Sequence, residues 1–417
     1  MFKNIAKNIL IMLEYEEAIN LILSEVNELE EIKLNISDSL GYVTSRKVFA
    51  KIDLPPFDNS AVDGYAVKSE DVANASKDNP VKLKIVGKIA AGDYADFEIK
   101  NGETAKVMTG AMIPKGADAV CMVEFTKEDN GYVEIYSKVK KWENVRFKGE
   151  EIKEGEVALE EKTFITPSVV GLLAKLGYNE VFVYRKPKVA LIVTGKELVQ
   201  PGNELEKGKI WDANSFSLEA SLKLDGFECK NISLVGDDKN LFENLVKEAV
   251  KNFDVILVSG GTSEGEEDFV REVFNKIGVR KVFWKVAIKP GKPIFFGKLN
   301  KTLLFALPGN PASAMVCYYE FVRPALLKMS GRKDIFLPKV KARLIEEIKR
   351  KPGRREFIRA ISFWNGNEYV VKSAGMQESH VLKSFAEANC FIVIDKEKEV
   401  CKENELVEVE LLPWFLK

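Results

Sequence analysis

The 417-residue sequence has few of the residues on which several common kinds of site depend. Its single histidine, His380, excludes a polyhistidine metal site and argues against serine–histidine catalysis. Its five cysteines are scattered without a CxxC spacing, so neither a disulfide framework nor a thiolate zinc site is expected. Such cysteine usage is typical of a reducing compartment, and we expect a cytoplasmic protein. Carboxylates, lysines and main-chain amides must therefore carry any chemistry.

Long apolar runs and an excess of one charge are also missing. The 62 Lys and Arg residues oppose 63 Asp and Glu, which gives no support for a nucleic-acid or membrane partner. The apolar patch in MFKNIAKNILIML is too short to span a bilayer, and either Met1 or Met12 fits a natural start. The absence of GxGxxG after the first strand and of GxxxxGK[ST] anywhere disfavours dinucleotide and P-loop sites.

The hydrophobic pattern predicts an α/β protein of several domains. Four apolar runs, VALIVTG, CKNISLVG, DVILVSGG and TLLFALPG, each end in glycine, and helical stretches lie between the first three and after the third. Such alternation predicts a doubly wound, mostly parallel sheet with helices on both faces. Short alternating strands elsewhere predict smaller β-rich domains. The expected domains are an N-terminal helix and linking domain at 1–54 and 141–184, a β-rich domain at 55–140, the α/β domain at 185–330 and a C-terminal β-barrel at 331–417.

Acidic loops follow the first three strands of this sheet, in VTGKEL, VGDD and SGGTSEGEED. Ligands of open α/β sheets bind beyond the carboxyl ends of the strands, where these loops lie. Taken singly, each loop is an ordinary strand-to-helix turn whose acid caps the next helix. Taken together, they favour a hard cation such as Mg²⁺ that bridges the acids to a phosphate, with glycine amides facing the anion.

Two later stretches combine proline and glycine with groups that suit anions. VAIKPGKPIFFG contains Lys289 and Lys292, and Lys285 directly precedes it. The residues alone leave a solvated turn and an oxyanion cradle equally open. ALPGNPASA precedes a helix, and is either a common proline cap or an anion site at a helix N-terminus. LPPFDNSAVDGYAV is a turn-rich stretch, which we interpret as a functional loop with Asp63 exposed.

Eight segments, taken in order, resemble the molybdopterin molybdenumtransferase (MoeA) family, which includes the C-terminal domain of gephyrin. They are FDNSAVDGYAV, VMTGAMIPKGADAV, VRFKGEEI, VTGKEL, IWDANS, SGGTSEGEEDF, AIKPGKP and LPGNPASA. The resemblance implies an elongated homodimer whose site lies between the α/β domain of one subunit and the small β domain of the other. It also implies a Mg²⁺-dependent reaction of adenylylated molybdopterin with molybdate, or tungstate, that releases AMP and molybdenum cofactor. The molybdopterin adenylyltransferase is a candidate partner.

The resemblance further implies roles for individual residues. Catalytic roles fall on Asp63, Glu151, Glu197, Asp237 and Asp268, and the implied metal ligands are Glu197, Asp237 and Asp268. Substrate-binding roles fall on Thr109, Arg146, Ser259, Gly260, Gly261, Ser263, Lys285, Lys289, Lys292, Pro308, Asn310, Pro311, Ser313, Arg354, Arg359 and Ser379. The C-terminal patterns also cover Arg355, Gln377 and His380. This chain departs from the family pattern at Lys196 and Glu151, where the family usually has aspartate, and at Glu264, where it has an apolar residue.

Two other functions stay open at this point. One is a non-catalytic molybdopterin-binding scaffold of the gephyrin type, and acids in all three loops and at Asp63 argue against it. The other is a molybdopterin adenylyltransferase, and the flanking β domains and FDNSAVDGYAV disfavour it. Molybdate and tungstate are dianions of nearly equal size, so both fit the lysines, the arginine and Ser379.

Overall fold

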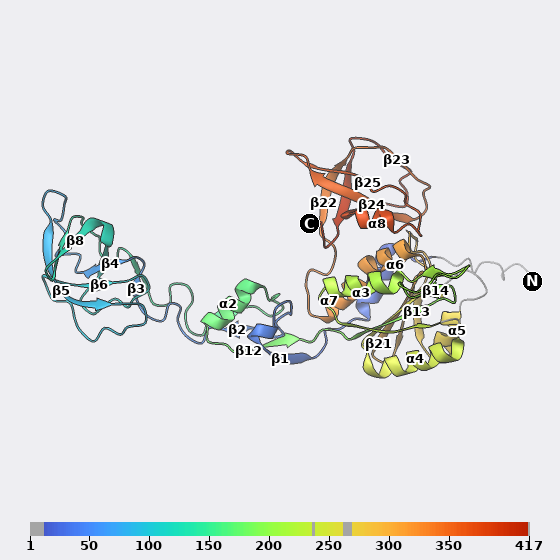
Figure 1. Ribbon diagram of the computed structural model, residues 1–417, viewed down its shortest axis with the longest axis horizontal. Coiled ribbons are helices and arrows are strands. Elements are labelled where there is room, and N and C mark those ends of the chain that lie inside the picture. The colour runs from blue at the N-terminus through green and yellow to red at the C-terminus, as the bar shows by residue number, and fades with distance from the viewer. Residues whose placement is uncertain (1–11, 236–237, 262–268, 416–417) are drawn as a thin grey trace, which may run out of the picture. The chain divides into compact units, whose positions relative to one another are not determined.

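A computed structural model describes residues 12–235, 238–261 and 269–415 of the chain, shown in Figure 1. These residues divide into two compact units. The larger unit takes in the described residues of 1–33, 41–45 and 182–417, and the smaller unit consists of residues 34–40 and 46–181. Among the helices of the described residues, none has the length and apolar character needed to cross a membrane.

The smaller unit is rich in short strands. Its elements are η1 (Ile36–Asp38), β2 (Val48–Phe49), β3 (Asn59–Ser60), β4 (Gly64–Val67), β5 (Val81–Ile89), β6 (Glu103–Val107), β7 (Ala119–Met122), η2 (Val123–Phe125), β8 (Thr126–Asp129), β9 (Tyr132–Ile135), β10 (Val145–Arg146), β11 (Val157–Leu159) and α2 (Pro167–Lys175). Six strands form one sheet in the order β7-β4-β6-β5-β9-β8. The Thr166 side chain caps α2 by accepting from the Val169 amide. The strands β1 (Glu31–Asn35) and β12 (Glu180–Tyr184) each span a boundary between the units.

The α/β domain of the larger unit is built on a six-stranded sheet. Its elements are α1 (Tyr15–Ser24), β13 (Val189–Thr194), β14 (Leu198–Val199), β15 (Ile210–Trp211), α3 (Asn214–Leu224), β16 (Cys229–Val235), α4 (Lys239–Asn252), β17 (Val255–Ser259), α5 (Phe269–Lys276), β18 (Arg280–Trp284), β20 (Phe295–Leu299), β21 (Thr302–Leu307), α6 (Pro311–Cys317), η3 (Tyr318–Val322) and α7 (Arg323–Met329). The strand order is β16-β13-β17-β21-β20-β18, and the first four strands are parallel. These four strands are the apolar runs that the sequence predicts.

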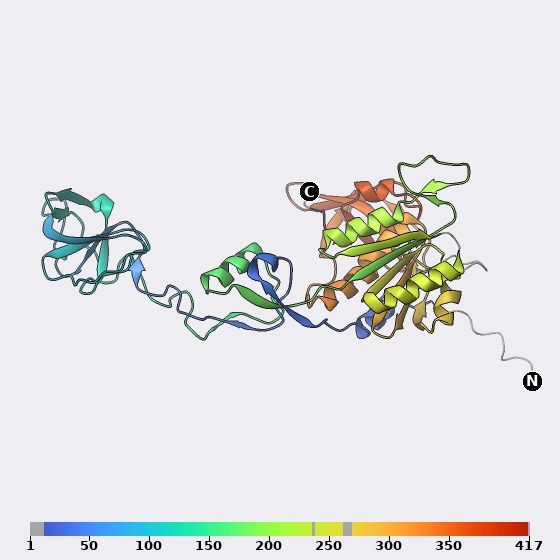
Figure 2. The same ribbon diagram turned by 60° about the horizontal axis from the view of Figure 1, so that its bottom comes forward.

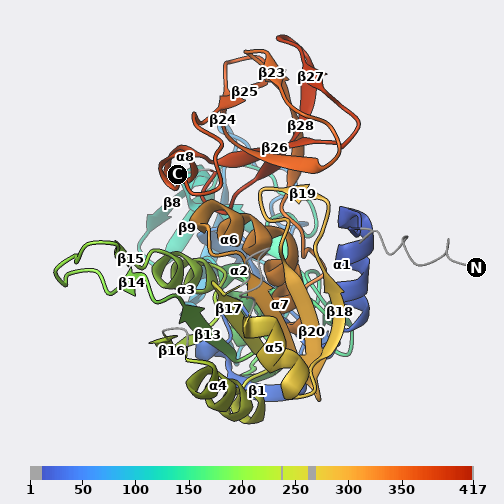
Figure 3. The same cartoon turned by 90° about the vertical axis from the view of Figure 1, so that its right-hand side faces the viewer.

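Both faces of this sheet are buried. Leu191 packs with residues of α1, α3 and α6, whereas its neighbour Ile192 packs with residues of α4 and α5 on the opposite face. Figure 2 shows α3 and α4 on opposite sides of the strands, and Figure 3 shows α5 beside α4. The predicted doubly wound, mostly parallel domain is therefore confirmed. The antiparallel strands β20 and β18 at one edge were not predicted.

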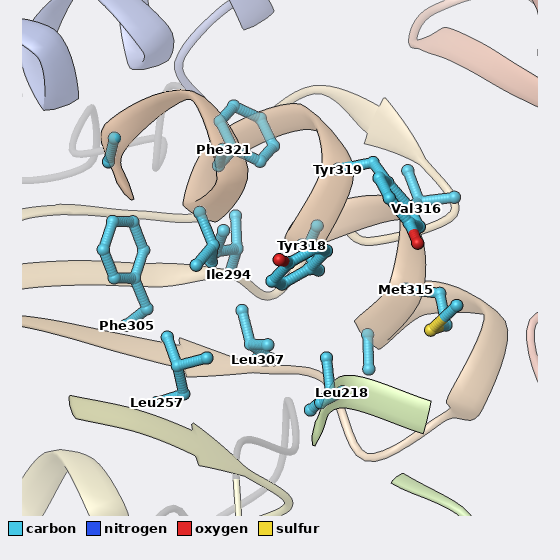
Figure 4. Close-up of a cluster of buried hydrophobic side chains, with 14 of the residues drawn as sticks. Leu218, Leu257, Ile294, Phe305, Leu307, Met315, Val316, Tyr318, Tyr319 and Phe321 are labelled. Atoms are coloured by element: carbon cyan, nitrogen blue, oxygen red, sulfur yellow. The ribbon is translucent and has the colours of Figure 1, made fainter. Parts of the chain in front are cut away.

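The largest hydrophobic core fixes the helices that follow β21. Figure 4 shows Leu257, Phe305 and Leu307 of the sheet on the side that faces Tyr318 and Phe321 of η3, and all five residues belong to one core. All five residues of η3 are buried. Because α6 runs directly into η3, this packing holds the first turn of α6 at the carboxyl end of β21.

The C-terminal strands close into a barrel. The elements of this domain are β22 (Lys339–Leu344), β23 (Ile348–Lys349), β24 (Arg355–Trp364), β25 (Tyr369–Ser373), α8 (Lys383–Glu387), β26 (Cys390–Ile394), β27 (Val400–Cys401) and β28 (Leu406–Leu411). The order is β24-β25-β22-β28-β26, and β26 pairs back with β24. The predicted C-terminal β-barrel is therefore confirmed. The short strand β19 (Ile288–Lys289) leaves the α/β domain and pairs with β24 in parallel.

A buried pair of carboxyl groups also joins the barrel to the α/β domain. Glu320 on η3 and Glu410 on β28 are 3% and 4% exposed. The Tyr15 hydroxyl donates to Glu320 Oε2 at 2.8 Å, and Lys339 Nζ lies 3.2 Å from Glu410 Oε1. The other two oxygens, Glu320 Oε1 and Glu410 Oε2, have no hydrogen-bond partner among the described residues. The two carboxyl groups are close enough for each to shift the pKa of the other. Two carboxyl groups can share a hydrogen bond only if one is protonated, so we assign a shared proton to the pair.

This proton predicts a pH-dependent stability. Burial, and then Glu410, raise the pKa of Glu320 well above its ordinary value of 4.5, so the folded pair keeps a proton that the unfolded chain releases. The unfolding free energy should therefore fall as pH rises above about 4.5, by at most about 1.4 kcal/mol per pH unit for one proton. Glu320→Gln keeps a donor toward Glu410 without this titration, so its unfolding free energy should depend less on pH.

The measurement is urea unfolding of the full chain between pH 5 and pH 8, monitored by a spectroscopic signal that comes from the larger unit. The difference between the unfolding free energies of wild type and Glu320→Gln should change steadily with pH. If this difference stays constant with pH, Glu320 has the same pKa in the folded and unfolded states, and the assignment of a shared proton is wrong.

Candidate functional site

A cavity of about 950 Å³ opens at the carboxyl edge of the parallel sheet. Its walls include residues 195–198 after β13, Gly260 and Gly261 after β17, and residues 308–311 after β21. These loops meet because parallel strands place their carboxyl ends at one edge. The ribbon β14-β15, Pro293 and His380 of the barrel domain also line the cavity.

Seven of the predicted site residues line this cavity. They are Glu197, Ser259, Gly260, Gly261, Pro308, Asn310 and Pro311. Gly260 has a φ of 93°, and a Cβ there would stand 2.1 Å from the Thr194 carbonyl oxygen, so only glycine fits. Ser313 lies in the first turn of α6 and is 4% exposed. The glycine loop thus presents bare main chain to the cavity.

Glu197 is the one predicted metal ligand within the described residues. Its carboxylate folds back over Gly195, and the described chain offers it neither a hydrogen bond nor an ion pair. Asp237 and Asp268, the other two predicted ligands, lie outside the described residues, as does Ser263. No three His, Cys, Asp or Glu side chains gather as a metal site within the described part of the chain. The three-carboxylate site therefore stays a prediction.

The three predicted lysines lie near the barrel side of the domain. Lys289 Nζ is 2.7 Å from Glu356 Oε1 of β24, and Lys285 Nζ is 4.1 Å from the centre of the Trp284 ring. The Lys292 carbonyl accepts from the Val286 amide. None of the three belongs to the lining of the described cavity.

A loop of the barrel docks on the first turn of α6. Asn310 Nδ2 donates to Ser379 Oγ at 2.9 Å, and the Ala312 amide donates to the Ser379 carbonyl at 3.1 Å. Both bonds place the neighbouring His380 at the cavity. The barrel therefore contributes to the same cavity as the sheet.

Arg359 supports this loop from inside the barrel. The side chain is fully buried, and its Nη2 donates to the carbonyl oxygens of Met376 and Glu378 at 3.0 and 3.2 Å. Burial lowers the pKa of Arg359 to about 10. Gln377 accepts from the Arg359 amide through its side-chain oxygen, and donates to the Arg359 carbonyl. The predicted substrate-binding arginine thus holds the loop that carries Ser379.

Two further predicted arginines link the barrel to its surroundings in the larger unit. Arg354 Nη1 donates to the Ile288 carbonyl at 3.4 Å. Arg355 pairs with Glu16 of α1 at 2.6 Å and with Asp395 at 2.8 Å. Both side chains therefore have protein partners in this structure.

The smaller unit brings together two predicted site residues. Asp63 Oδ1 accepts from the amide and the hydroxyl of Thr109, at 2.7 and 2.8 Å. A Cβ on the next residue, Gly64, would stand 2.0 Å from the Cys121 carbonyl oxygen, so the close approach of β7 requires glycine. Glu151 forms an exposed ion pair with Lys175.

Arg146 lies on β10, which pairs with β3. Its register partner is Asn59, four residues before Asp63. The smaller unit therefore holds Asp63, Thr109, Glu151 and Arg146, the predicted site residues that precede the α/β domain.

Comparisons with known proteins cover nearly the whole chain. Consecutive parts match the MoeA N-terminal region (domain I and II) at 13–177, a probable molybdopterin binding domain at 190–328 and the MoeA C-terminal region (domain IV) at 341–412. The chain is 37% identical over 380 residues to a Haemophilus influenzae protein named molybdopterin molybdenumtransferase, covering 90% of this chain and 93% of that one. The chain belongs to the MoeA family.

Other members of the MoeA family agree with this assignment. A Staphylococcus aureus protein of the same name is 33% identical, covering 95% of this chain and 94% of its own. The crystal structure of a molybdopterin biosynthesis moeA protein from Pyrococcus horikoshii OT3 matches with a TM-score of 0.82 and 32% identity. That match covers 96% of this chain and 100% of the other. The resemblance found in the sequence is therefore confirmed.

Sequence reasoning missed three residues of this MoeA-family cavity, Thr194, Asp212 and Asn214. Asp212 is 2% exposed and accepts from the amide and the hydroxyl of Ser215, which orders the start of α3. Asn214 is the first residue of that helix. The segment IWDANS was used only for the resemblance, although an acid and an amide between a short strand and a helix are a signal of a polar helix start.

The Asp63–Thr109 contact predicts a measurable pKa. The main-chain N–H and the hydroxyl of Thr109 lower the pKa of Asp63 below its ordinary value, because both bonds favour the charged form. Thr109→Val removes only the hydroxyl, so the pKa of Asp63 should rise and still stay below the ordinary value. The measurement is an NMR pH titration of the aspartate carboxyl carbons. Asp53, whose pKa is lowered by the main-chain N–H of Glu154 and by Lys148, is the internal control, and its pKa should not change. An unchanged pKa of Asp63 in Thr109→Val would show that the hydrogen bond from the Thr109 hydroxyl is not formed.

Proposed function

We propose that the chain inserts molybdate, or tungstate, into adenylylated molybdopterin and releases AMP. The observation that carries the proposal is the cavity at the carboxyl edge of the sheet, where the glycine loop meets the Glu197 carboxylate, which no described residue engages. Membership of the MoeA family supports the same substrate class. Every lining residue described comes from the larger unit, so one chain supplies these walls.

The donor set fits a hard cation. Glu197 offers carboxylate oxygens that no described residue engages, and oxygen is the ligand that Mg²⁺ prefers. We propose Glu197, Asp237 and Asp268 as the residues that would hold it. Mg²⁺ bound there would supply charge neutralisation at the phosphoanhydride.

The chain's own groups then act by binding and orientation. Gly260 and Gly261 line the cavity with main-chain atoms only. Glycine is required at both positions because a side chain would collide with Thr194 or with Val270. The Asn310–Ser379 bond fixes the barrel loop against the first turn of α6, which keeps His380 at the cavity. A reaction of this kind needs positioning and charge neutralisation more than a covalent nucleophile.

We also propose that the enzyme is a cytoplasmic homodimer in which Asp63 and Thr109 of one subunit complete the site of the other. The support is the exposed Asp63 carboxylate, which the Thr109 amide and hydroxyl hold in place by two hydrogen bonds. The five free cysteines support a reducing compartment. The molybdopterin adenylyltransferase is the partner that would deliver the adenylylated substrate.

The direct test is AMP release from adenylylated molybdopterin in the presence of molybdate and Mg²⁺. Glu197→Gln keeps the shape of the side chain and removes its charge, so we expect a loss of roughly 100-fold in rate with an unchanged thermal midpoint. Glu204→Gln, in the connection between β14 and β15 and outside the cavity lining, is the matched control and should keep wild-type activity.

Equal rates for Glu197→Gln and wild type would contradict the role of Glu197. If wild type releases no AMP but consumes ATP with metal-free molybdopterin, the function is that of an adenylyltransferase. If it binds molybdopterin and turns over neither substrate, the function is that of a scaffold.

A further inference from the structure

Two polar atoms at the cavity have no hydrogen-bond partner among the described residues. They are Thr194 Oγ1 and Asn214 Oδ1. Thr194 is 2% exposed and Asn214 is 7% exposed, and both residues line the cavity. A buried polar atom without a partner destabilises a fold, so such atoms beside a binding cavity point to a ligand.

The orientation of the Asn214 amide follows from its partners. Its Nδ2 lies 2.8 Å from the Gly309 carbonyl oxygen and 2.8 Å from Ser259 Oγ. Because a carbonyl oxygen can only accept, the atom that faces Gly309 must be the nitrogen. Both amide hydrogens are then used between the loops after β17 and β21, and Oδ1 is left as an acceptor.

Thr194 is the last residue of β13 and lies beside the glycine loop. Its Oγ1 would be 3.0 Å from a Cβ on Gly261 and 3.1 Å from one on Gly260. A hydroxyl can donate as well as accept, whereas the Asn214 oxygen can only accept. The pair therefore matches a ligand group that carries at least one N–H or O–H.

This requirement excludes the ionised ends of the substrate. The oxygens of the phosphoanhydride and of molybdate are acceptors at neutral pH, and they would be repelled by Asn214 Oδ1. The amino and ring N–H groups of a pterin, and the hydroxyls of a ribose, have the required donors.

We infer that Asn214 Oδ1 and Thr194 Oγ1 form the end of the cavity that binds the neutral, donor-bearing part of the substrate. Asn214 thereby recognises the ligand with its oxygen while its nitrogen holds the two loops in place. The inference rests on the proposed function and adds a specificity site to it.

The test uses Thr194→Val, which removes the hydroxyl at nearly constant shape. The free protein should keep or raise its thermal midpoint, because an unpartnered hydroxyl is lost. The affinity for adenylylated molybdopterin, measured by calorimetry, should fall by about 3- to 10-fold, as for one neutral hydrogen bond. A residue with only a structural role would not lower affinity while leaving stability intact.

Thr302→Val is the matched control. Thr302 is also buried at a strand, but its hydroxyl donates to the carbonyl oxygens of Val250 and Phe253. This variant should lower the thermal midpoint and leave the affinity of the folded protein unchanged. We therefore expect Thr194→Val to lower the affinity and not the thermal midpoint, and Thr302→Val to lower the thermal midpoint and not the affinity.

Two smaller probes identify which part of the substrate is bound at this end. AMP carries the ribose hydroxyls and the adenine amino group, and pterin-6-carboxylate carries the pterin N–H groups. The probe that loses affinity in Thr194→Val and keeps it in Thr302→Val is the one that contacts Thr194.

The experiment distinguishes a failure of this inference from a failure of the proposed function. If wild type binds adenylylated molybdopterin and Thr194→Val binds it equally well, the inference is wrong and the proposed function stands. A lower thermal midpoint for free Thr194→Val would also overturn the inference, since the hydroxyl would then have a partner in the protein. If wild type does not bind adenylylated molybdopterin, the proposed function fails and the inference fails with it.

Discussion

The parallel pairing of β16, β13, β17 and β21 is the constraint on which the site depends. The strands β13, β17 and β21 are buried on both faces, so a slip of β13 by one residue would exchange Leu191 and Ile192 between two different cores. The register is therefore fixed, and the loops that follow Thr194, Ser259 and Leu307 open at the same edge. The position of the cavity therefore follows from the common direction of the strands and not from any individual side chain.

The barrel is bound to this edge by contacts of three kinds. The strand β19 of the α/β domain pairs with β24 of the barrel, so main-chain hydrogen bonds join the two domains. The Glu320–Glu410 pair adds a buried, proton-sharing contact, and the Asn310–Ser379 bond docks a loop on α6. Because α6 begins where β21 ends, these contacts also determine the geometry of the cavity wall.

Much of the fold follows from periodicity, since the four parallel strands, the helices between them and the barrel each have a clear pattern. The strand β20 was missed because its residues lie in the lysine-rich stretch that suggested an anion site. The partners of Thr194 and Asn214 could not be predicted, because Ser259 and Gly309 are distant in sequence and meet only in the folded sheet. For the same reason the sequence did not reveal that Arg359 faces the main chain of its own domain. The domain boundaries and the roles of individual site residues stay predictions.

The central claim is that a nucleotide-bearing ligand and its cation bind together at the carboxyl edge of this sheet. X-ray diffraction from crystals grown with AMP and Mn²⁺, at the manganese absorption edge, measures both positions at once. The account predicts an anomalous peak at coordination distance from the Glu197 carboxylate, with AMP density between the glycine loop and residues 308–311. Manganese and AMP bound together elsewhere on the protein, with only solvent in the cavity, would contradict it.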